Sequence, residues 1–272
     1  MQKIDYKKQL KALYGPSAKD VVEVDVPPLN YLMIDGTGGP DGPAFQAAIA
    51  ALFPLAYTLK FMIKKGPLAI DFGVMPLEGL WWADDMSTFI AGDKDKWLWT
   101  LMIMQPDLIT APLVDEAVAA VKKKQNPHAL PQVRFARYDE GRCAQILHKG
   151  PFFEEGPTVE RLHAFIASQG CALTKKHHEI YLSDIRRAAP RQKTSKPCSD
   201  SPWGKGRSPD PFALAGPAPP MISARRAVGA YVALCLFLNG KFKTVSTVVM
   251  VTQEGASDDT YREIEDQYHQ GF

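Results

Sequence analysis

Two glutamates fall inside segments with the apolar character of β-strands, Glu78 in MPLEGLWW and Glu179 in HHEIYL. A carboxylate on the inner face of a half-buried strand is costly unless a cation, a hydrogen-bond donor or a ligand meets it, so both are candidate site residues. In HHEIYL the alternation of a strand places Glu179 and Tyr181 on one face and Ile180 on the other. We expect Ile180 to face the covering helices, and Glu179 and Tyr181 to face the opposite side. An ordinary solvent-exposed face is the alternative.

Aromatic side chains concentrate in the first half of the chain, namely Tyr57, Trp81, Trp82, Trp97 and Trp99. Indole rings offer wide, flat surfaces suited to stacking planar ligands or cations. Because neighbouring strand residues point to opposite faces, Trp81 and Trp82 cannot both serve one core. Any one of these residues could simply fill the core, but a sheet rarely needs so many indoles. The group therefore predicts a surface for planar ligands.

No segment has the spacing of a metal or cofactor site. His148 and the adjacent pair His177 and His178 lack a histidine or cysteine partner at a metal-binding spacing, and the four cysteines lie far apart. The glycine-rich stretch at residues 36–42 lacks the Lys-Ser/Thr of a phosphate-binding loop. We therefore expect neither a metal nor a cofactor, and we expect the cysteines to be reduced thiols.

An internal repeat sets the expected architecture. VEVDVPPLNYLMIDG, from Val22, and VRFARYDEGRCAQILHKG, from Val133, each contain a short alternating strand, a turn and a second apolar strand. In each copy an acidic residue followed by Gly-Pro then opens a helix, because proline suits the first helical position. Strand segments follow at 70–82 and 96–105 in the first copy and at 177–182 in the second. The predicted fold class is α+β, with two fused strand–helix–strand–strand units whose seam forms a cleft.

The helices of this architecture also have sequence signals. The first carries apolar residues at spacings of three and four, typical of a core-facing stripe. Pro54 inside it predicts a kink or a break near Phe53, because proline lacks the N–H that the helix needs. An amphipathic helix over 107–124 is expected to connect the two copies.

Composition limits the partners. The formal net charge is +2 and the basic residues are scattered, which favours neither a nucleic-acid surface nor a polybasic membrane patch. The N-terminal segment is charged throughout and lacks the apolar centre of a signal peptide. The longest late apolar run, 227–238, is too short to span a bilayer. We expect a cytoplasmic protein that binds no nucleic acid and no membrane, while its oligomeric state is left open.

Several long segments together resemble a stand-alone GyrI-like protein: KIDYKKQLKALYGPSAKDVVEVDVP, MPLEGLWWADD, CAQILHKGPFFEEGPT and HHEIYLSDIRRAAP. The resemblance runs from residue 3 to about residue 190. It implies two fused SH2-like repeats that bind amphipathic, planar or cationic compounds in the cleft between them, with Glu179 of a Glu-x-Tyr segment as the characteristic acidic residue. About twenty residues precede the first strand, too few for the DNA-reading module that many relatives carry. The expected ligand-binding residues are Tyr57, Glu78, Trp81, Trp82, Trp97, His148, Glu179 and Tyr181.

Three functions remain open at this point. The first is ligand binding without catalysis. The second is hydrolysis, because the branch that this chain resembles includes hydrolases that open the cyclopropane ring of DNA-alkylating natural products. The resemblance then implies two catalytic residues, Glu179 as general base and Tyr181 as an aid at the carbonyl end. The third is an inhibitor-like module that binds a protein partner, which should expose an apolar patch outside the cleft.

The last third of the chain departs from the resemblance. Residues 191–220 are rich in Pro, Ser, Gly and Lys and lack strand periodicity, which predicts a disordered linker between a domain at 1–190 and an unassigned extension at 221–272. A shifted reading frame would equally account for the extension. KFKTVSTVVMV, residues 241–251, has the β-branched composition to fill a strand position that the second repeat otherwise lacks.

Overall fold

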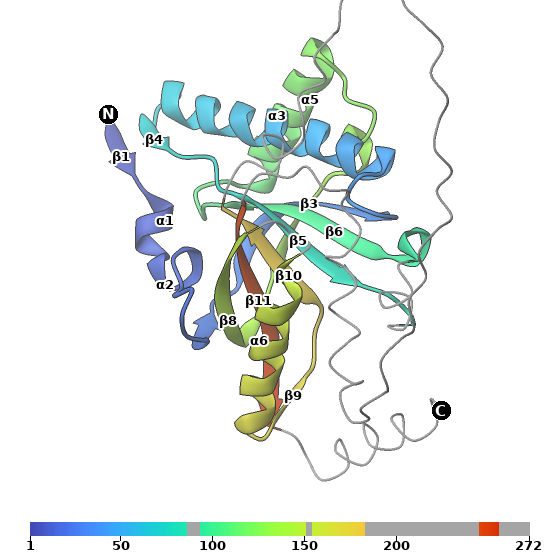
Figure 1. Cartoon of the computed structure of the whole chain (residues 1–272). Helices are drawn as coiled ribbons and strands as arrows, with labels where there is room; N and C mark the ends of the chain where they lie inside the picture. Colours follow the sequence, from blue (N-terminus) through green and yellow to red (C-terminus); the bar gives the residue numbers. More distant parts are fainter. Residues whose placement is uncertain (86–92, 151–153, 183–244, 256–272) are drawn as a thin grey trace, which may run out of the picture.

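One antiparallel sheet of nine strands carries both halves of the chain in the computed structural model, which describes residues 1–85, 93–150, 154–182 and 245–255 (Figure 1). The main strand order is β2-β8-β11-β10-β5-β6-β3-β7, with β9 paired to β11, and β1 and β4 form a separate parallel pair. The predicted α+β class is confirmed. The elements are β1 (Gln2–Ile4), α1 (Tyr6–Gln9), α2 (Lys11–Tyr14), β2 (Val22–Val26), β3 (Leu29–Thr37), α3 (Pro43–Lys65), β4 (Ile70–Phe72), β5 (Leu77–Trp82), η1 (Lys94–Lys96), β6 (Leu98–Gln105), α5 (Ala111–Lys124), η2 (Leu130–Gln132), β7 (Arg134–Tyr138), β8 (Gly141–Gly150), α6 (Gly156–Ser168), β9 (Cys171–Leu173), β10 (His177–Tyr181) and β11 (Val245–Gly255).

Each half of the sheet is built from one strand–helix–strand–strand unit. In the first unit β3 is followed by α3, β5 and β6, and β6 lies between β3 and β5. In the second unit β8 is followed by α6, β10 and β11, and β11 lies between β8 and β10. β5 and β10 pair antiparallel at the seam, with Gly79 opposite Glu179. The predicted pair of fused repeats is therefore present.

The short strand before each unit joins the sheet of the other unit. β2 precedes β3 in sequence but pairs with β8, and β7 precedes β8 but pairs with β3. Pro27 and Pro28 therefore do not close a hairpin, and they lead the chain from one half of the sheet to the other. This exchange ties the two units together at both outer edges.

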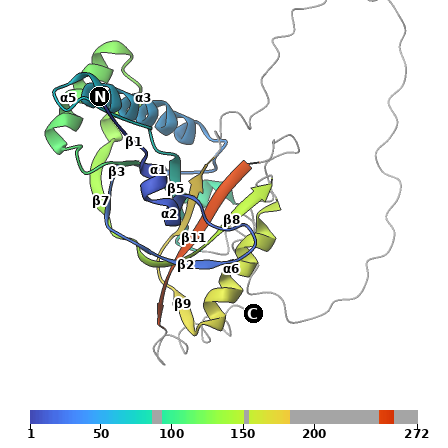
Figure 2. The ribbon, with the colours of Figure 1, turned by 90° about the vertical axis from the view of Figure 1, so that its left-hand side faces the viewer.

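β11 completes the second unit from far along the chain. Its residues pair with β8 on one side and with β10 on the other, so it is an interior strand (Figure 2). Val248, Val249 and Met250 are fully buried there. The predicted linker at 191–220 lies outside the described residues, as does most of the predicted extension. The part of that extension at 245–255 is a strand of the sheet.

α3 begins at Pro43 and continues through Pro54 to Lys65. The break expected near Phe53 is therefore absent, and the Thr58 hydroxyl donates to the Pro54 carbonyl at 2.7 Å. α3 packs on β3 and β6, and α5 packs on α3, whereas α6 covers β8 and β11 (Figure 1). The helices α3 and α6 thus lie on the same face of the sheet, one over each unit.

α3 is the one helix among the described residues that is long and apolar enough to cross a membrane. In this fold it instead lies along the sheet, where Phe45, Leu52, Leu55 and Leu59 join the main core with exposures of 1% or less. The fold is that of a soluble domain, and α3 is one of its core helices.

The two faces of the sheet are covered by different parts of the chain. On the face that we call the helix face, Phe45 of α3 stacks on Trp81, and Val249 packs in a cluster with α6. On the other, which we call the reverse face, the Tyr14 hydroxyl of α2 donates to Glu78 in β5 at 2.8 Å. This contact places α2 against β5 on the reverse face (Figure 2). Alternate residues of each central strand therefore meet two unlike environments.

Ending the chain at residue 244 removes β11 and leaves the facing edges of β8 and β10 unpaired. We expect this variant to lose the cooperative unfolding of the second unit, because the buried N–H and C=O groups of two strands would have no partners. A chain ending at residue 255 keeps β11 and is the matched control. Circular dichroism during thermal melting makes the comparison. Equal melting temperatures for the two shortened chains would contradict the placement of β11 inside the sheet.

Candidate functional site

The helix face at the seam brings Glu179, Tyr181 and Trp81 together. All three residues are almost fully buried, with exposures of 3%, 6% and 2%. The Trp81 indole Nε1 donates to the Tyr181 hydroxyl at 2.9 Å, and that hydroxyl also hydrogen-bonds to Glu179. Gly79 makes room for this contact, since a Cβ there would lie 2.9 Å from the indole Nε1 and 3.0 Å from the hydroxyl. The result is a linked chain of donors and acceptors ending on a carboxylate.

Glu179 and Tyr181 lie on one face of β10, as the strand alternation predicts. That face is the one covered by the helices, whereas Ile180 was expected to face them. Ile180 does not face α3 and α6; it lies on the reverse face, opposite Glu78 of β5. Glu179 shares the helix face with Val249, its neighbour across β11. The reason is that the large indole of Trp81 shares the face of Glu179 and is stacked by Phe45 of α3, which fixes this face as the covered one.

Two further polar side chains reach the same region. His177 also lies on the helix face of β10, and its Nε2 is 3.3 Å from Glu179 Oε1. Glu155, which precedes the first residue of α6, is fully buried. Burial and the charge of Glu179 raise the pKa of Tyr181 well above its ordinary value, and the charge of Glu155 adds to this effect. Tyr181 is therefore a neutral hydroxyl near pH 7, with two carboxylates close to it.

His148 and Trp97 lie next to this group. The Trp97 ring is fully buried and stands edge-on to Trp81, with 6.4 Å between ring centroids. His148 is opposite Thr247 of β11, and Thr247 is in turn opposite Tyr181, so all three occupy one row across the helix face. The His148 Nδ1 lies 3.1 Å from the hydroxyl of Thr158 in α6. These residues extend the candidate site toward the two covering helices.

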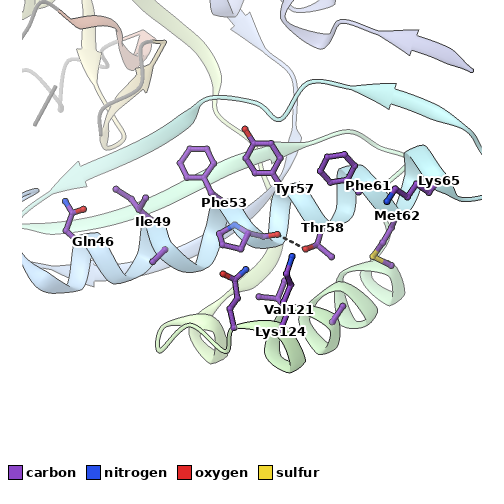
Figure 3. A pocket seen from close by; sticks show the side chains of 14 residues that line it. Gln46, Ile49, Phe53, Tyr57, Thr58, Phe61, Met62, Lys65, Val121 and Lys124 are labelled. Atoms are coloured by element: carbon purple, nitrogen blue, oxygen red, sulfur yellow. Dashed lines mark hydrogen bonds between the residues drawn. The ribbon is translucent and has the colours of Figure 1, made fainter. Parts of the chain in front are cut away.

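Tyr57 does not reach the seam. It is 45% exposed and lies with Phe53 and Phe61 along the outer side of α3, beside a groove of about 870 Å³ between α3 and α5 (Figure 3). The core-facing stripe of α3 includes Ala56 and Leu59, and helical periodicity turns residue 57 away from them. The expectation that Tyr57 would join the indoles followed from its position in the sequence, and the structure corrects it.

Trp82 and Glu78 lie on the reverse face, away from Glu179. Trp82 alternates with Trp81 along β5, so the ring expected to clamp a ligand in the cleft points to the other side of the sheet. Glu78 is fully buried, and its carboxylate accepts from the Tyr14 hydroxyl and lies 3.1 Å from His178 Nε2. The predicted need of Glu78 for a polar partner is thus met by the protein itself, and Glu78 does not join Glu179 on the helix face.

His178 is held between two carboxylates on the reverse face. Its Nδ1 lies 2.7 Å from Glu140 Oε2 and its Nε2 lies 3.1 Å from Glu78 Oε2, and all three residues have exposures of 1% or less. Burial alone would lower the pKa of His178, but Glu140 and Glu78 outweigh that effect and raise the pKa to about 10. The imidazolium therefore joins β10 to β5 and to the turn before β8, across the seam.

The free energy of unfolding should fall as the pH rises from 7 to 10. Folded His178 keeps its proton up to about pH 10, whereas an unfolded histidine loses it near about pH 6.5. Between these values the folded state holds one proton more, so each pH unit lowers the free energy of unfolding by about 1.4 kcal/mol. Below the unfolded pKa the stabilisation is fully present.

Urea unfolding at several pH values measures this slope. His178→Gln should remove it, and His128→Gln, at an exposed histidine, should keep it. A slope that is the same in the original chain and in the His178 variant would contradict a buried imidazolium.

Sequence reasoning missed Glu155 and the role of His177. The sequence identifies Glu155 only as the acidic residue before a helix-opening Gly-Pro. The structure places its backbone at that position, and its carbonyl accepts from the Thr158 and Val159 N–H groups. Its burial beside Tyr181 depends on where α6 lands on the sheet, which no local pattern encodes. For His177 a signal was present, since alternation already placed it on the face of Glu179.

Comparisons with known proteins agree with this architecture. A family model described as a GyrI-like small molecule binding domain matches residues 19–194. An uncharacterized conserved protein from Listeria innocua is 31% identical, with a TM-score of 0.65, and the match covers 92% of this chain and 100% of that one. Two structures described as hydrolases from Listeria innocua are 30% and 31% identical, with TM-scores of 0.64 and 0.67, covering 92% and 93% of this chain and 100% of theirs. No curated protein matched the sequence.

The family model covers more than half of the chain, and the similar structures match it along nearly its whole length. The double repeat seen in the sheet is in keeping with these matches. The chain belongs to the GyrI-like family of small-molecule-binding domains.

Proposed function

We propose that this chain binds amphipathic, planar or cationic small molecules on the helix face at the seam, with Glu179 as the counter-charge of the cationic ones. The observation that carries the proposal is a buried carboxylate whose one ion-pair partner among the described residues is His177, a side chain that is charged only when protonated. Glu155 adds a second buried carboxylate near the same hydroxyl. A cation entering this region would gain from ion pairing in a medium of lower dielectric constant than water.

The aromatic surroundings support the planar character of the ligand. Trp81 is fixed by its hydrogen bond to Tyr181, by the stacked ring of Phe45 at 5.7 Å and by the edge of Trp97. A rigid indole loses little conformational freedom when a flat ring stacks on it, and its π face attracts cations. Trp81 and Trp97 therefore take the clamping role in this proposal, in place of Trp82.

Hydrolysis is the second candidate function, and it concerns the same residues. Two of the similar structures are described as hydrolases, which is weak support. In opening a conjugated cyclopropane, water adds to a ring carbon, the C–C bond electrons move toward the carbonyl oxygen, and that oxygen takes a proton. Glu179 would accept the proton from water, and Tyr181, kept neutral by its raised pKa, would turn its one proton from Glu179 to donate a hydrogen bond at the carbonyl end. Such an activity would serve detoxification.

We also infer that the protein acts in the cytoplasm and binds neither DNA nor a membrane. The net charge of +2 and the dispersed basic residues support this inference, because duplex-binding proteins usually carry a basic face. A salt-resistant, sequence-specific shift of duplex DNA would contradict it.

Glu179→Gln keeps the shape of the side chain and removes its charge. The variant should weaken the binding of planar cations by about 1–3 kcal/mol, the scale of a charge-assisted hydrogen bond, and should change the binding of neutral planar compounds much less. Isothermal titration calorimetry with a cationic dye and a neutral analogue measures the difference. Glu160→Gln, at an exposed carboxylate of α6, is the matched control. Equal losses for cationic and neutral compounds would contradict the assigned role of Glu179.

The same variant distinguishes binding from hydrolysis. A panel of cyclopropane-bearing compounds, followed by chromatography for ring-opened products, should show turnover with the original chain only if it is a hydrolase. In that case Glu179→Gln should abolish turnover while the planar substrate still binds. Turnover that survives this change would exclude Glu179 as the general base.

Gly79→Ala tests the aromatic wall separately from the charge. The added Cβ would push apart the Trp81 indole and the Tyr181 hydroxyl, so we expect a destabilisation of about 1–3 kcal/mol, typical of overpacking, and weaker binding of cationic and neutral planar compounds alike. Gly73→Ala is the control, because nothing lies within 4 Å of a Cβ at Gly73. Thermal melting and calorimetry provide the readouts. Unchanged affinity in Gly79→Ala would show that this wall does not contact the ligand.

A further inference from the structure

Trp82 lines a second cavity, on the reverse face of the sheet. The cavity has a volume of about 530 Å³ and lies among β3, β5, β6, β7 and the segment that leads into β10. Its apolar lining includes Met33 and Leu80, each 3% exposed, together with Trp82 and Tyr138. Adjacent residues of β5 thus serve two places, since Trp81 belongs to the seam and Trp82 to this reverse-face cavity.

Among the residues that the structure describes, no acidic side chain lines the reverse-face cavity and four cationic side chains do: Arg134, Arg137, Lys175 and Lys176. The charge of Arg134 is neutralised by Asp35, to which its Nε and Nη2 donate at 3.2 and 2.9 Å. Thr100 donates to the same carboxylate at 2.6 Å. Lys175 is oriented differently, with its ammonium donating to the carbonyls of Asp139 and Glu140 at 2.8 and 3.1 Å. Its charge is therefore held in place, and no carboxylate in the described part of the chain forms an ion pair with it.

Lys176, the last of the four, lies over an aromatic ring. Its ammonium lies 3.1 Å from the centroid of the Trp82 ring, and among the described residues no carboxylate forms an ion pair with it. Burial lowers the pKa of Lys176; Asp35 opposes this effect, and the neighbouring Arg134 adds to it. A partly buried ammonium beside other cations is an environment that an anion would stabilise.

We propose that the reverse-face cavity is a second ligand site, for a planar aromatic compound that carries a carboxylate, sulfonate or phosphate group. The anionic group pairs with Lys176 and its cationic neighbours, and the ring lies against the apolar floor that Leu80, Met33 and Trp82 provide. Charged donors bind such oxyanions with shorter and stronger hydrogen bonds than neutral donors do. The site differs from the seam in face and in charge preference, so the two can be tested independently.

Naphthalene-2-sulfonate is a suitable probe, because its ring is planar and its sulfonate stays ionised across the working pH range. We expect saturable binding by calorimetry that is about tenfold tighter than that of naphthalene-2-methanol or of inorganic sulfate, as a charge-assisted contact combined with ring burial predicts. In the ¹⁵N–¹H spectrum the indole signal of Trp82, assigned with Trp82→Phe, should shift, while that of Trp81 stays. Binding should weaken as salt is added.

Lys176→Gln and Arg137→Gln should each weaken sulfonate binding about fivefold to tenfold, the scale of losing one charged donor. Lys123→Gln, at an exposed lysine of α5, and Glu179→Gln should leave it unchanged. Thermal melting of each variant checks that the fold is kept. Absence of saturable binding would overturn the proposal. So would equal affinities for the sulfonate, the alcohol and sulfate, or a changed affinity in Glu179→Gln, which would place the probe at the seam beside that carboxylate.

Discussion

The antiparallel pairing of β5 with β10 joins the two units, and the site residues are ordered around it. Each strand presents alternate side chains to opposite faces, so one register decides which residues meet. With Gly79 opposite Glu179, Trp81 reaches Tyr181 on the helix face, and Glu78 reaches His178 on the reverse face. A shift of one residue would exchange these partners. The buried charges therefore depend on this register, and they in turn stabilise it.

Buried charges have different partners on the helix face and on the reverse face of the sheet. On the reverse face the imidazolium of His178 lies between Glu140 and Glu78, so each charge has an opposite charge within hydrogen-bond distance. On the helix face Glu179 has a histidine and a neutral hydroxyl beside it, and Glu155 adds further negative charge. A buried charge without full compensation is unfavourable in a folded protein unless something else provides the compensation. A cationic ligand would supply it on the helix face.

Sequence reasoning reached the fold class and the repeat because both follow from local signals. The Gly-Pro entries to α3 and α6 and the alternation in HHEIYL are properties of a few neighbouring residues. Local signals could not show that Glu78 and Glu179, both expected to be site residues, lie in different environments. Both are glutamates in apolar strands, and only the covering segments, α2 in one case and α3 with α6 in the other, distinguish them.

The positions of Tyr57 and of β11, which the sequence did not predict in full, are also determined by long-range packing. Tyr57 lies on the outer side of α3 because the opposite stripe of that helix covers the sheet, which depends on the rotation of the whole helix. β11 pairs with β8 and β10, which lie far before it in the chain. Its composition indicated that this segment could fill the strand position that the second repeat lacks, but not which two strands it would pair with. That β11 fills the same place in the second unit as β6 does in the first follows from the sheet order alone.

We expect the seam, and Glu179 in particular, to receive the positive charge of a planar ligand. A crystal structure of the full chain with a bound planar cationic dye tests this most directly. The dye should lie on the helix face, with its ring against Trp81 and its cationic nitrogen within ion-pair distance of the Glu179 carboxylate. A dye bound in the reverse-face cavity or along α3, with the seam closed around Glu179, would contradict it.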